Sequence, residues 1–257
     1  EHHKIRTVFW NNPIYPEKLK RLGFPPAVLF FHGDIEVLNA PTVAIVGARC
    51  PTNLGRLWVE AVIPKIVEAG VTTVSGGARG IDGDVHMATL NSLGKTVAFL
   101  PGGIDRPYPG GNYGIFERIK KTVLLISEYG PQTCVRPENF HKRNRLIVGS
   151  ADIVIIVEAA FKSGTIMTAR KALHENIDIM VVPGPPMVQS LAKSLLIALL
   201  CNSQMLVARL QNGSVTDVAV EGNLLFISHG SGALDVYDIS IPQIPLFVRT
   251  TALPNSA

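Results

Sequence analysis

The residues best suited to chemistry in this 257-residue chain lie between Asn139 and Arg145. The stretch reads Asn-Phe-His-Lys-Arg-Asn-Arg and combines three cationic side chains, a histidine and one aromatic ring. Cations neutralise phosphate and an aromatic ring stacks on a base, so this combination is typical of a single-stranded nucleic-acid site. The alternative is a solvated turn with a helix start, in which Phe140 fills a gap in the core.

A second set of candidate residues lies in glycine-rich turns, each of which follows a short apolar run. Glycine lets the backbone approach a ligand closely, and a helix start or an arginine beside it favours an anion. The turns are Gly47-Ala48-Arg49, Ser75-Gly76-Gly77-Ala78-Arg79-Gly80-Ile81-Asp82, Pro101-Gly102-Gly103 and Lys162-Ser163-Gly164-Thr165. Because several such turns converge on one sheet edge, the sequence predicts an anion or phosphate site there.

Candidate catalytic groups are sparse. Asp82 and His86 stand one turn apart on a predicted helix, where a capping carboxylate and a packed histidine are favoured over a general base. Glu128 and Glu158 follow predicted strands and are either carboxylate bases or, as we favour, partners of nearby arginines. No G-x-G-x-x-G follows the strand at 43–46, and no G-x-x-x-x-G-K-[ST] occurs, so neither a dinucleotide nor an ATP cofactor is indicated.

Strands and helices alternate from Thr42 onward. The predicted strands are 43–46, 72–74, 96–100, 122–127, 153–157 and 179–182, and the predicted helices are 54–69, 82–93, 113–121 and 165–175. This alternation predicts an α/β fold with a parallel, doubly wound sheet. In such sheets ligands bind at the carboxyl ends of the strands, where the glycine-rich turns stand. The basic stretch falls between two of these strands, and we expect it to be a loop at the sheet edge.

Composition and charge bound the class of protein. Hydrophobic residues make up 47% of the chain and charged residues 17%, which indicates a globular protein. The formal net charge of +4 permits a polyanionic partner without requiring one. The cysteines Cys50, Cys134 and Cys201 have no short spacing, so neither a disulfide framework nor a zinc site is indicated, which fits a reducing cytosol. No signal peptide opens the chain, and the apolar run 195–201 is too short to span a bilayer.

The predicted organisation has three parts. Residues 1–40 are an N-terminal lead-in of the core, with a short helix at 15–22 and a strand at 28–31, and residues 41–186 are the ligand-binding core. Residues 187–257 form a helix and a β-rich tail. The first residue, Glu1, is not methionine, which fits a fragment of a longer product.

The tail has its own pattern. We expect an amphipathic helix over 187–200, then two strands within 215–228 and a third over 233–240. This resembles one blade of a β-propeller, and such blades need neighbours to cover their faces. We therefore expect either an artificially cut or joined chain or a short β-rich C-terminal appendage.

Taken in order, the motifs of residues 13–186 resemble the DNA-processing protein A family, also called DprA or Smf. The motifs are Gly47-Ala48-Arg49, Ser75-Gly76-x-Ala78-Arg79-Gly80-Ile81-Asp82 followed by His86, Tyr108-Pro109, Ser127-Glu128, Phe140-x-x-Arg143-Asn144-Arg145, Glu158-Ala159, Ser163-Gly164-Thr165 and Val182-Pro183-Gly184. The resemblance implies an extended Rossmann-like fold that binds single-stranded DNA without catalysis or cofactor. It also implies a cytoplasmic homodimer that hands incoming DNA to a RecA-type recombinase during natural transformation.

The resemblance also assigns roles to residues. It places Arg49 on a phosphate, Ser75, Gly76, Arg79 and Gly80 in a phosphate nest, and Phe140 against a base. It lines the DNA track with Lys142, Arg143, Asn144 and Arg145, and it adds backbone and hydroxyl donors at Ser163, Gly164 and Thr165.

The sequence departs from the family pattern in four places. Gly77 replaces a leucine, and His141 replaces a proline after Phe140, which loosens that expected loop. We see no room before residue 13 for the helical domain that often precedes this fold. After Pro186 the match is expected to end, without the winged-helix module of many members.

Two other functions stay open from the residues. One is an enzyme resembling the nucleoside-monophosphate phosphoribohydrolases, which usually carry a P-G-G-x-G-T-x-x-E element. Here Ser163-Gly164-Thr165 lacks the following glutamate, and Pro101-Gly102-Gly103 is a partial echo. The other is a nucleotide-sensing module with the same pocket.

Overall fold

The computed structural model describes residues 5–159 and 163–182, together with the backbone of residues 215–221, 224–229, 233–238 and 246–252. The chain divides into two compact units, Glu1–Gly184 and Pro185–Ala257, and each is described by itself. Within the described ranges, no helix combines the length and the apolar character needed to cross a membrane.

One eight-stranded sheet organises the first unit, in the order β1-β2-β6-β5-β4-β3-β7-β8. The strands are β1 Arg6–Phe9, β2 Val28–Gly33, β3 Thr42–Val46, β4 Thr72–Ser75, β5 Thr96–Phe99, β6 Leu124–Ser127, β7 Ile153–Ile156 and β8 Asp178–Val181. Strands β3 to β8 pair in parallel, whereas β1 and β2 run antiparallel at one edge. The predicted α/β fold with a doubly wound, mostly parallel sheet is confirmed, and β1 is a strand that the sequence analysis missed.

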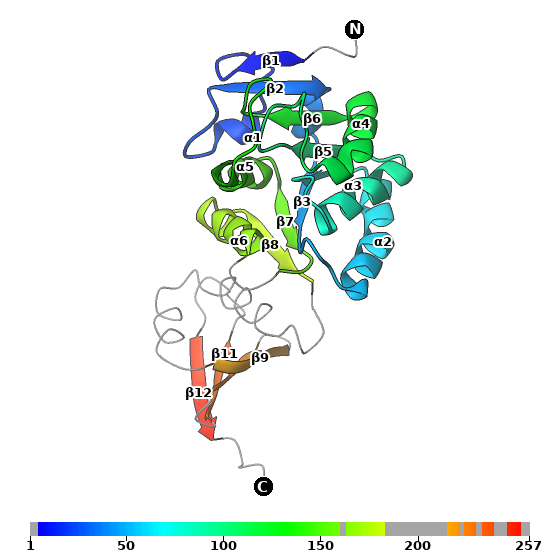
Figure 1. Ribbon diagram of the computed structural model, residues 1–257. Helices are drawn as coiled ribbons and strands as arrows, with labels where there is room; N and C mark the ends of the chain where they lie inside the picture. Colours follow the sequence, from blue (N-terminus) through cyan, green and yellow to red (C-terminus); the bar gives the residue numbers. More distant parts are fainter. Residues whose placement is uncertain are drawn as a thin grey trace. The chain divides into compact units, whose positions relative to one another are not determined.

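Helices cover both faces of this sheet, as Figure 1 shows, with α2, α3 and α4 on one face and α5 and α6 on the other. The helical segments are α1 Glu17–Lys20, α2 Asn53–Glu68, α3 Ile81–Asn91, α4 Tyr113–Thr122, α5 Pro137–Gly149 and α6 Gly164–His174, with 3-10 turns at Ile35–Asn39 and Gly110–Asn112. From β3 the chain builds the sheet outward to β6, then returns through α5 to place β7 on the other side of β3. The strand order therefore reverses between β3 and β7, and the carboxyl ends of these strands border the crevice where such folds bind ligands.

The centre of the sheet is buried on both faces, which explains its continuous apolar runs. All five residues of β3 are buried. Val43 and Ile45 of β3 pack with Val59 and Ile63 of α2 and with Ile81 of α3 in one core cluster. Parallel strands covered by helices on both faces require this composition, so the apolar runs could be read as strands from the sequence.

The second unit contains a four-stranded antiparallel sheet in the order β12-β11-β10-β9. Its strands are β9 Val215–Glu221, β10 Leu224–His229, β11 Ala233–Asp238 and β12 Leu246–Ala252. The three predicted strands are confirmed, and β12 is one that the sequence analysis missed. The likeness to a propeller blade stays a prediction, and the predicted helix at 187–200 lies outside the described residues.

His86 lies inside the core of the first unit and is fully buried. Its Nδ1 atom is 2.7 Å from the hydroxyl oxygen of Thr96. Burial, aided by the positive charge of Arg143, lowers the pKa of His86 to about 3. The ring is therefore neutral at physiological pH and has no access to solvent, which agrees with the packing role favoured from the sequence.

We expect the stability of the protein to fall in mild acid because of His86. In the unfolded chain this side chain takes up a proton as the pH falls through its ordinary pKa of 6.5, whereas the folded state keeps it neutral. Between pH 7 and pH 5 this difference lowers the free energy of unfolding by about 2 kcal/mol. Urea unfolding at the two pH values should show this loss, and His86→Gln should remove it.

The matched control is His174→Gln, because the His174 side chain is 86% exposed. This variant should keep the acid sensitivity of the parent protein. Equal pH dependence in the parent and in His86→Gln would contradict the assignment.

Candidate nucleic-acid interface

The basic stretch lies within helix α5, which corrects the loop expected from the sequence. Pro137 occupies the first turn of this helix, where its fixed backbone torsion favours helix formation. The helical period then sorts the side chains, because residues three and four apart share a face. Phe140, Arg143 and Asn144 lie together, whereas Lys142 and Arg145 turn to other sides of the helix.

Arg143 is 3% exposed, and its expected place on the DNA track stays a prediction. Its Nη1 atom donates a hydrogen bond of 2.8 Å to the carbonyl oxygen of Phe99 at the end of β5. Asn139 adds a second tie from α5, donating to the carbonyl oxygen of Pro101 at 2.9 Å. Burial lowers the pKa of Arg143 to about 10, and the charge of nearby Asp82 opposes that shift. Arg143 therefore anchors α5 to the sheet.

The glycine-rich turn between β4 and α3 holds a carboxylate of the chain itself. The Asp82 side chain accepts hydrogen bonds from the backbone N–H groups of Gly76 at 3.2 Å and Ala78 at 3.3 Å. Burial raises the pKa of Asp82, while the charge of Arg143 and these N–H groups act in the opposite direction. Of the four residues expected in a phosphate nest, Gly76 donates to Asp82, and Ser75, itself buried, donates to the carbonyl oxygen of Ile45. A phosphate contact at this turn stays a prediction.

Two glycines in this turn are required by space. A Cβ atom on Gly76 would lie 1.9 Å from Nη1 of Arg143, so the guanidinium occupies the room of a missing side chain. Gly80 has a φ of 77°, and a Cβ atom there would lie 2.3 Å from the carbonyl oxygen of Ala48. At both positions the absence of a side chain lets neighbouring groups approach the backbone closely.

The two glutamates at strand ends have different partners. Glu128 forms an ion pair with Arg145, as favoured from the sequence, and both side chains are mostly buried. Arg145 therefore has a partner within the protein, and its expected place on the DNA track stays a prediction. The favoured arginine partner of Glu158 is wrong, because its carboxylate accepts from the backbone N–H of Thr52 at 2.8 Å and from the Thr52 hydroxyl at the start of α2.

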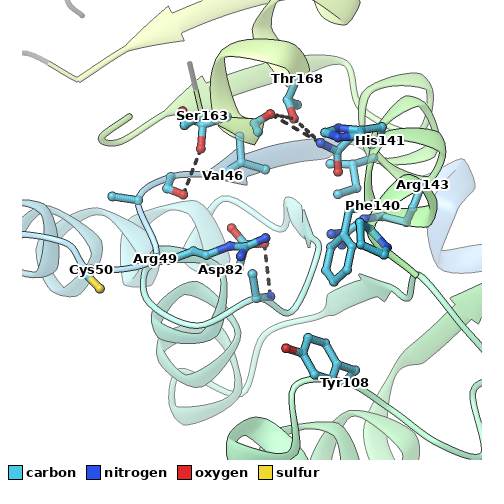
Figure 2. A pocket seen from close by; sticks show the side chains of 18 residues that line it. Val46, Arg49, Cys50, Asp82, Tyr108, Phe140, His141, Arg143, Ser163 and Thr168 are labelled. Atoms are coloured by element: carbon cyan, nitrogen blue, oxygen red, sulfur yellow. Dashed lines mark hydrogen bonds between the residues drawn. The ribbon is translucent and has the colours of Figure 1, made fainter. Parts of the chain in front are cut away.

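A cavity of about 700 Å³ lies at the reversal of strand order, between the carboxyl ends of β3 and β4 and the helices α5 and α6. Its lining is Val46, Gly47, Ala48, Arg49, Cys50, Ala78, Asp82, Tyr108, Pro137, Phe140, His141, Arg143, Asn144, Ile147, Ser163, Gly164, Thr165 and Thr168. Figure 2 shows how these side chains surround the space. The structure therefore brings together seven of the residues singled out from the sequence, which are Arg49, Phe140, Arg143, Asn144, Ser163, Gly164 and Thr165.

Six other residues to which the resemblance assigns DNA-binding roles lie outside this lining. Lys142 and Arg79 are exposed to solvent. Ser75 and Gly76 are buried beneath the cavity-lining turn, Gly80 begins α3, and Arg145 pairs with Glu128.

Phe140 stands at the centre of a cluster of cations and aromatic rings. The guanidinium carbon of the exposed Arg49 is 5.5 Å from the centre of the Phe140 ring, and that of Arg143 is 5.9 Å away. The Tyr108 ring lies edge-on to Phe140, with 6.0 Å between ring centres. Cations and ring edges surround a face of negative potential, so this arrangement holds Phe140 in place. The sequence analysis assigned no role to Tyr108, which belongs to one of the family motifs. Its contact with Phe140 joins two residues that lie 32 positions apart in the sequence.

The N-terminus of α6 forms another wall of the cavity. Thr165 donates its hydroxyl to the carbonyl oxygen of Gly47 at 3.0 Å, which ties the start of α6 to the end of β3. Asn144 donates to the hydroxyl of Thr168 at 2.9 Å and fixes α6 against α5. The first N–H groups of a helix have no acceptor within it, so the turn at Ser163, Gly164 and Thr165 can bind an anion.

The family model described as DNA recombination-mediator protein A matches residues 6–208. The chain belongs to this family. The match passes Pro186, where the sequence analysis expected it to end, and it includes β1.

Curated relatives support the assignment. The chain is 37% identical over 181 residues to the DNA processing protein DprA of Bacillus subtilis, covering 70% of this chain and 61% of that protein. It is 38% identical over 183 residues to Protein Smf of Synechocystis, covering 70% of this chain and 46% of that protein. The chain therefore spans about half of the length of such relatives.

Two solved structures share both fold and sequence with the chain. The X-ray structure of DprA from Streptococcus pneumoniae has a TM-score of 0.70 at 35% identity, covering 76% of this chain and 68% of that one. A structure of DNA processing protein A from Helicobacter pylori has a TM-score of 0.64 at 32% identity, covering 70% of this chain and 82% of that one. That structure addresses the single-stranded DNA binding mode of the Helicobacter protein.

We expect Gly76→Ala to destabilise the protein, because the new methyl group would push against the buried guanidinium of Arg143. Overpacking of this kind costs about 1–3 kcal/mol. The matched control is Gly114→Ala in α4, where nothing lies within 4 Å of an added Cβ atom. The control should be neutral or stabilising by up to about 1 kcal/mol, since alanine favours helix. Urea unfolding measures both, and equal stability of the two variants would contradict the packing described.

Proposed function

We propose that this chain binds single-stranded DNA in the cavity between β3, β4, α5 and α6. The observation that carries the proposal is the exposed guanidinium of Arg49, 5.5 Å from the centre of the Phe140 ring, among the residues that line the cavity. A cation beside an aromatic ring offers one contact for a phosphate and one for a base. The structure of the Helicobacter relative, which shares this fold, addresses how that protein binds single-stranded DNA.

The structure supports dividing the candidate residues into those that contact DNA and those that position the contacting residues. We assign the phosphates to Arg49, with Arg79 and Lys142 as exposed cations nearby in the sequence motifs, and a base to Phe140. The N–H and hydroxyl donors of Ser163, Gly164 and Thr165 receive a further phosphate. Arg143, Asn144 and Arg145 position α5 and α6, and Ser75, Gly76 and Gly80 shape the turn beneath them.

We propose that this binding involves no catalysis. Among the described residues that line the cavity, the one carboxylate is Asp82, whose Oδ2 atom accepts from the backbone N–H groups of Gly76 and Ala78. A ribohydrolase needs a carboxylate that is free to reach the sugar, so the enzymatic alternative draws no support from this arrangement. Release of free base from AMP by the purified chain would overturn this part of the proposal.

Family membership carries the rest of the proposal. We infer a recombination mediator that protects incoming DNA and loads a RecA-type recombinase in natural transformation. We also infer a homodimer located in the cytoplasm. Size-exclusion chromatography with light scattering tests the dimer, and a pull-down with purified RecA on oligo-dT tests the recombinase.

We expect Arg49→Ala and Phe140→Ala to weaken binding to an oligo-dT in different ways. Loss of a charged phosphate contact should lower affinity about tenfold and reduce the dependence of log affinity on log salt by about 0.7. Loss of a stacking ring should lower affinity about 5- to 150-fold and leave that salt dependence unchanged. Fluorescence anisotropy titrations at several salt concentrations measure both quantities.

Arg118→Ala is the matched control, since it removes the same charge from an exposed side chain that donates to Asn91 on the neighbouring helix α3. This variant should bind like the parent. Absence of binding by the parent at low salt would sink the proposed function, and unchanged affinity in both cavity variants would refute the assigned site.

A further inference from the structure

Tyr108 is an exposed aromatic residue that shares the cavity with Phe140. The residue is 50% exposed, and its ring lines the same cavity as Arg49. The planes of the Tyr108 and Phe140 rings meet at 79°, with 6.0 Å between their centres. Figure 2 shows the two rings bordering one space, reached from different parts of the chain. They form an aromatic corner, in which a flat group stacked on one ring meets the edge of the other.

The segment that carries Tyr108 is tied to two neighbouring loops. After Tyr108, the side chain of Asn112 donates to the carbonyl oxygens of Gly77 at 3.0 Å and Ala78 at 2.9 Å in the glycine-rich turn. Before it, the carboxylate of Asp105 accepts from the backbone N–H of Gln132 at 2.9 and 3.0 Å.

These two ties have a consequence for an exposed ring. An exposed tyrosine on an untethered segment would lose conformational freedom on contact with a ligand. Here hydrogen bonds hold the segment on both sides of Tyr108, so less conformational entropy is lost when a ligand contacts the ring.

We propose that Tyr108 is a second base-contacting residue and that Tyr108 and Phe140 together hold one unpaired base of the bound strand. The inference rests on the proposed function and extends it to a residue on a different segment from α5. Bases in a duplex are stacked on their neighbours, whereas a base in a single strand can present a face to a protein ring. The aromatic corner therefore favours single strands over duplexes at this point of the track.

The test compares Tyr108→Ala with the parent on two oligonucleotides, oligo-dT and an abasic strand of the same length and charge. We expect Tyr108→Ala to bind oligo-dT about fivefold or more weakly, the loss typical of one stacking contact. On the abasic strand, which offers no base, parent and variant should bind equally. Tyr108→Phe keeps the ring and should bind oligo-dT like the parent.

Tyr113→Ala is the matched control, because Tyr113 is 55% exposed at the start of α4 and its ring lies beside Lys120, outside the cavity lining. This variant should bind both strands like the parent. If the parent binds oligo-dT and Tyr108→Ala binds it equally well, the inference fails and the proposed function stands. Equal losses on both strands would assign Tyr108 a purely structural role and overturn the inference too. No binding of oligo-dT by the parent would overturn both.

Discussion

The hydrogen bond from the buried guanidinium of Arg143 to the carbonyl oxygen of Phe99 fixes the geometry of the whole site. A charge removed from water destabilises a fold unless partners compensate it, and here Asp82 and the β5 carbonyl do so. Asp82 in turn organises the glycine-rich turn, and Gly76 leaves the room that the guanidinium fills. The anchor thus sets where α5 lies, and α5 sets where Phe140 presents its ring.

The helical period of α5 points some of its side chains into the protein and others to solvent. Cations that look equivalent in the sequence point in different directions once wound into a helix. Arg143 and Arg145 face the protein and hold α5 against β5 and Glu128, whereas Lys142 faces solvent. A segment dense in basic residues can therefore leave few cations free to bind a polyanion, because the others have partners within the protein. In the proposed function, the phosphate contact then comes from the exposed Arg49, which follows strand β3.

The sheet and its ligand edge could be predicted because their signals are local. Apolar runs closed by glycine mark strands buried on both faces, and the parallel order follows from the helices between them. The burial of Arg143 could not be predicted, since its partner Phe99 lies 44 positions away. The contact between Tyr108 and Phe140 could not be predicted for the same reason, since the two residues lie far apart in the sequence. Asp82 in the glycine-rich turn was within reach, because four to six residues separate it from its donors.

The empty place at Gly76 has a consequence for how this sequence can change. Its missing side chain and the long side chain of Arg143 fill one volume between them, so the two positions form a single unit of variation. A larger residue at 76 fits without overlap only beside a shorter one at 143, and that exchange would remove the hydrogen bond from α5 to Phe99 and leave the one from Asn139 to Pro101. A substitution at 76 alone therefore overpacks the guanidinium, and a shorter residue at 143 alone leaves its volume unfilled.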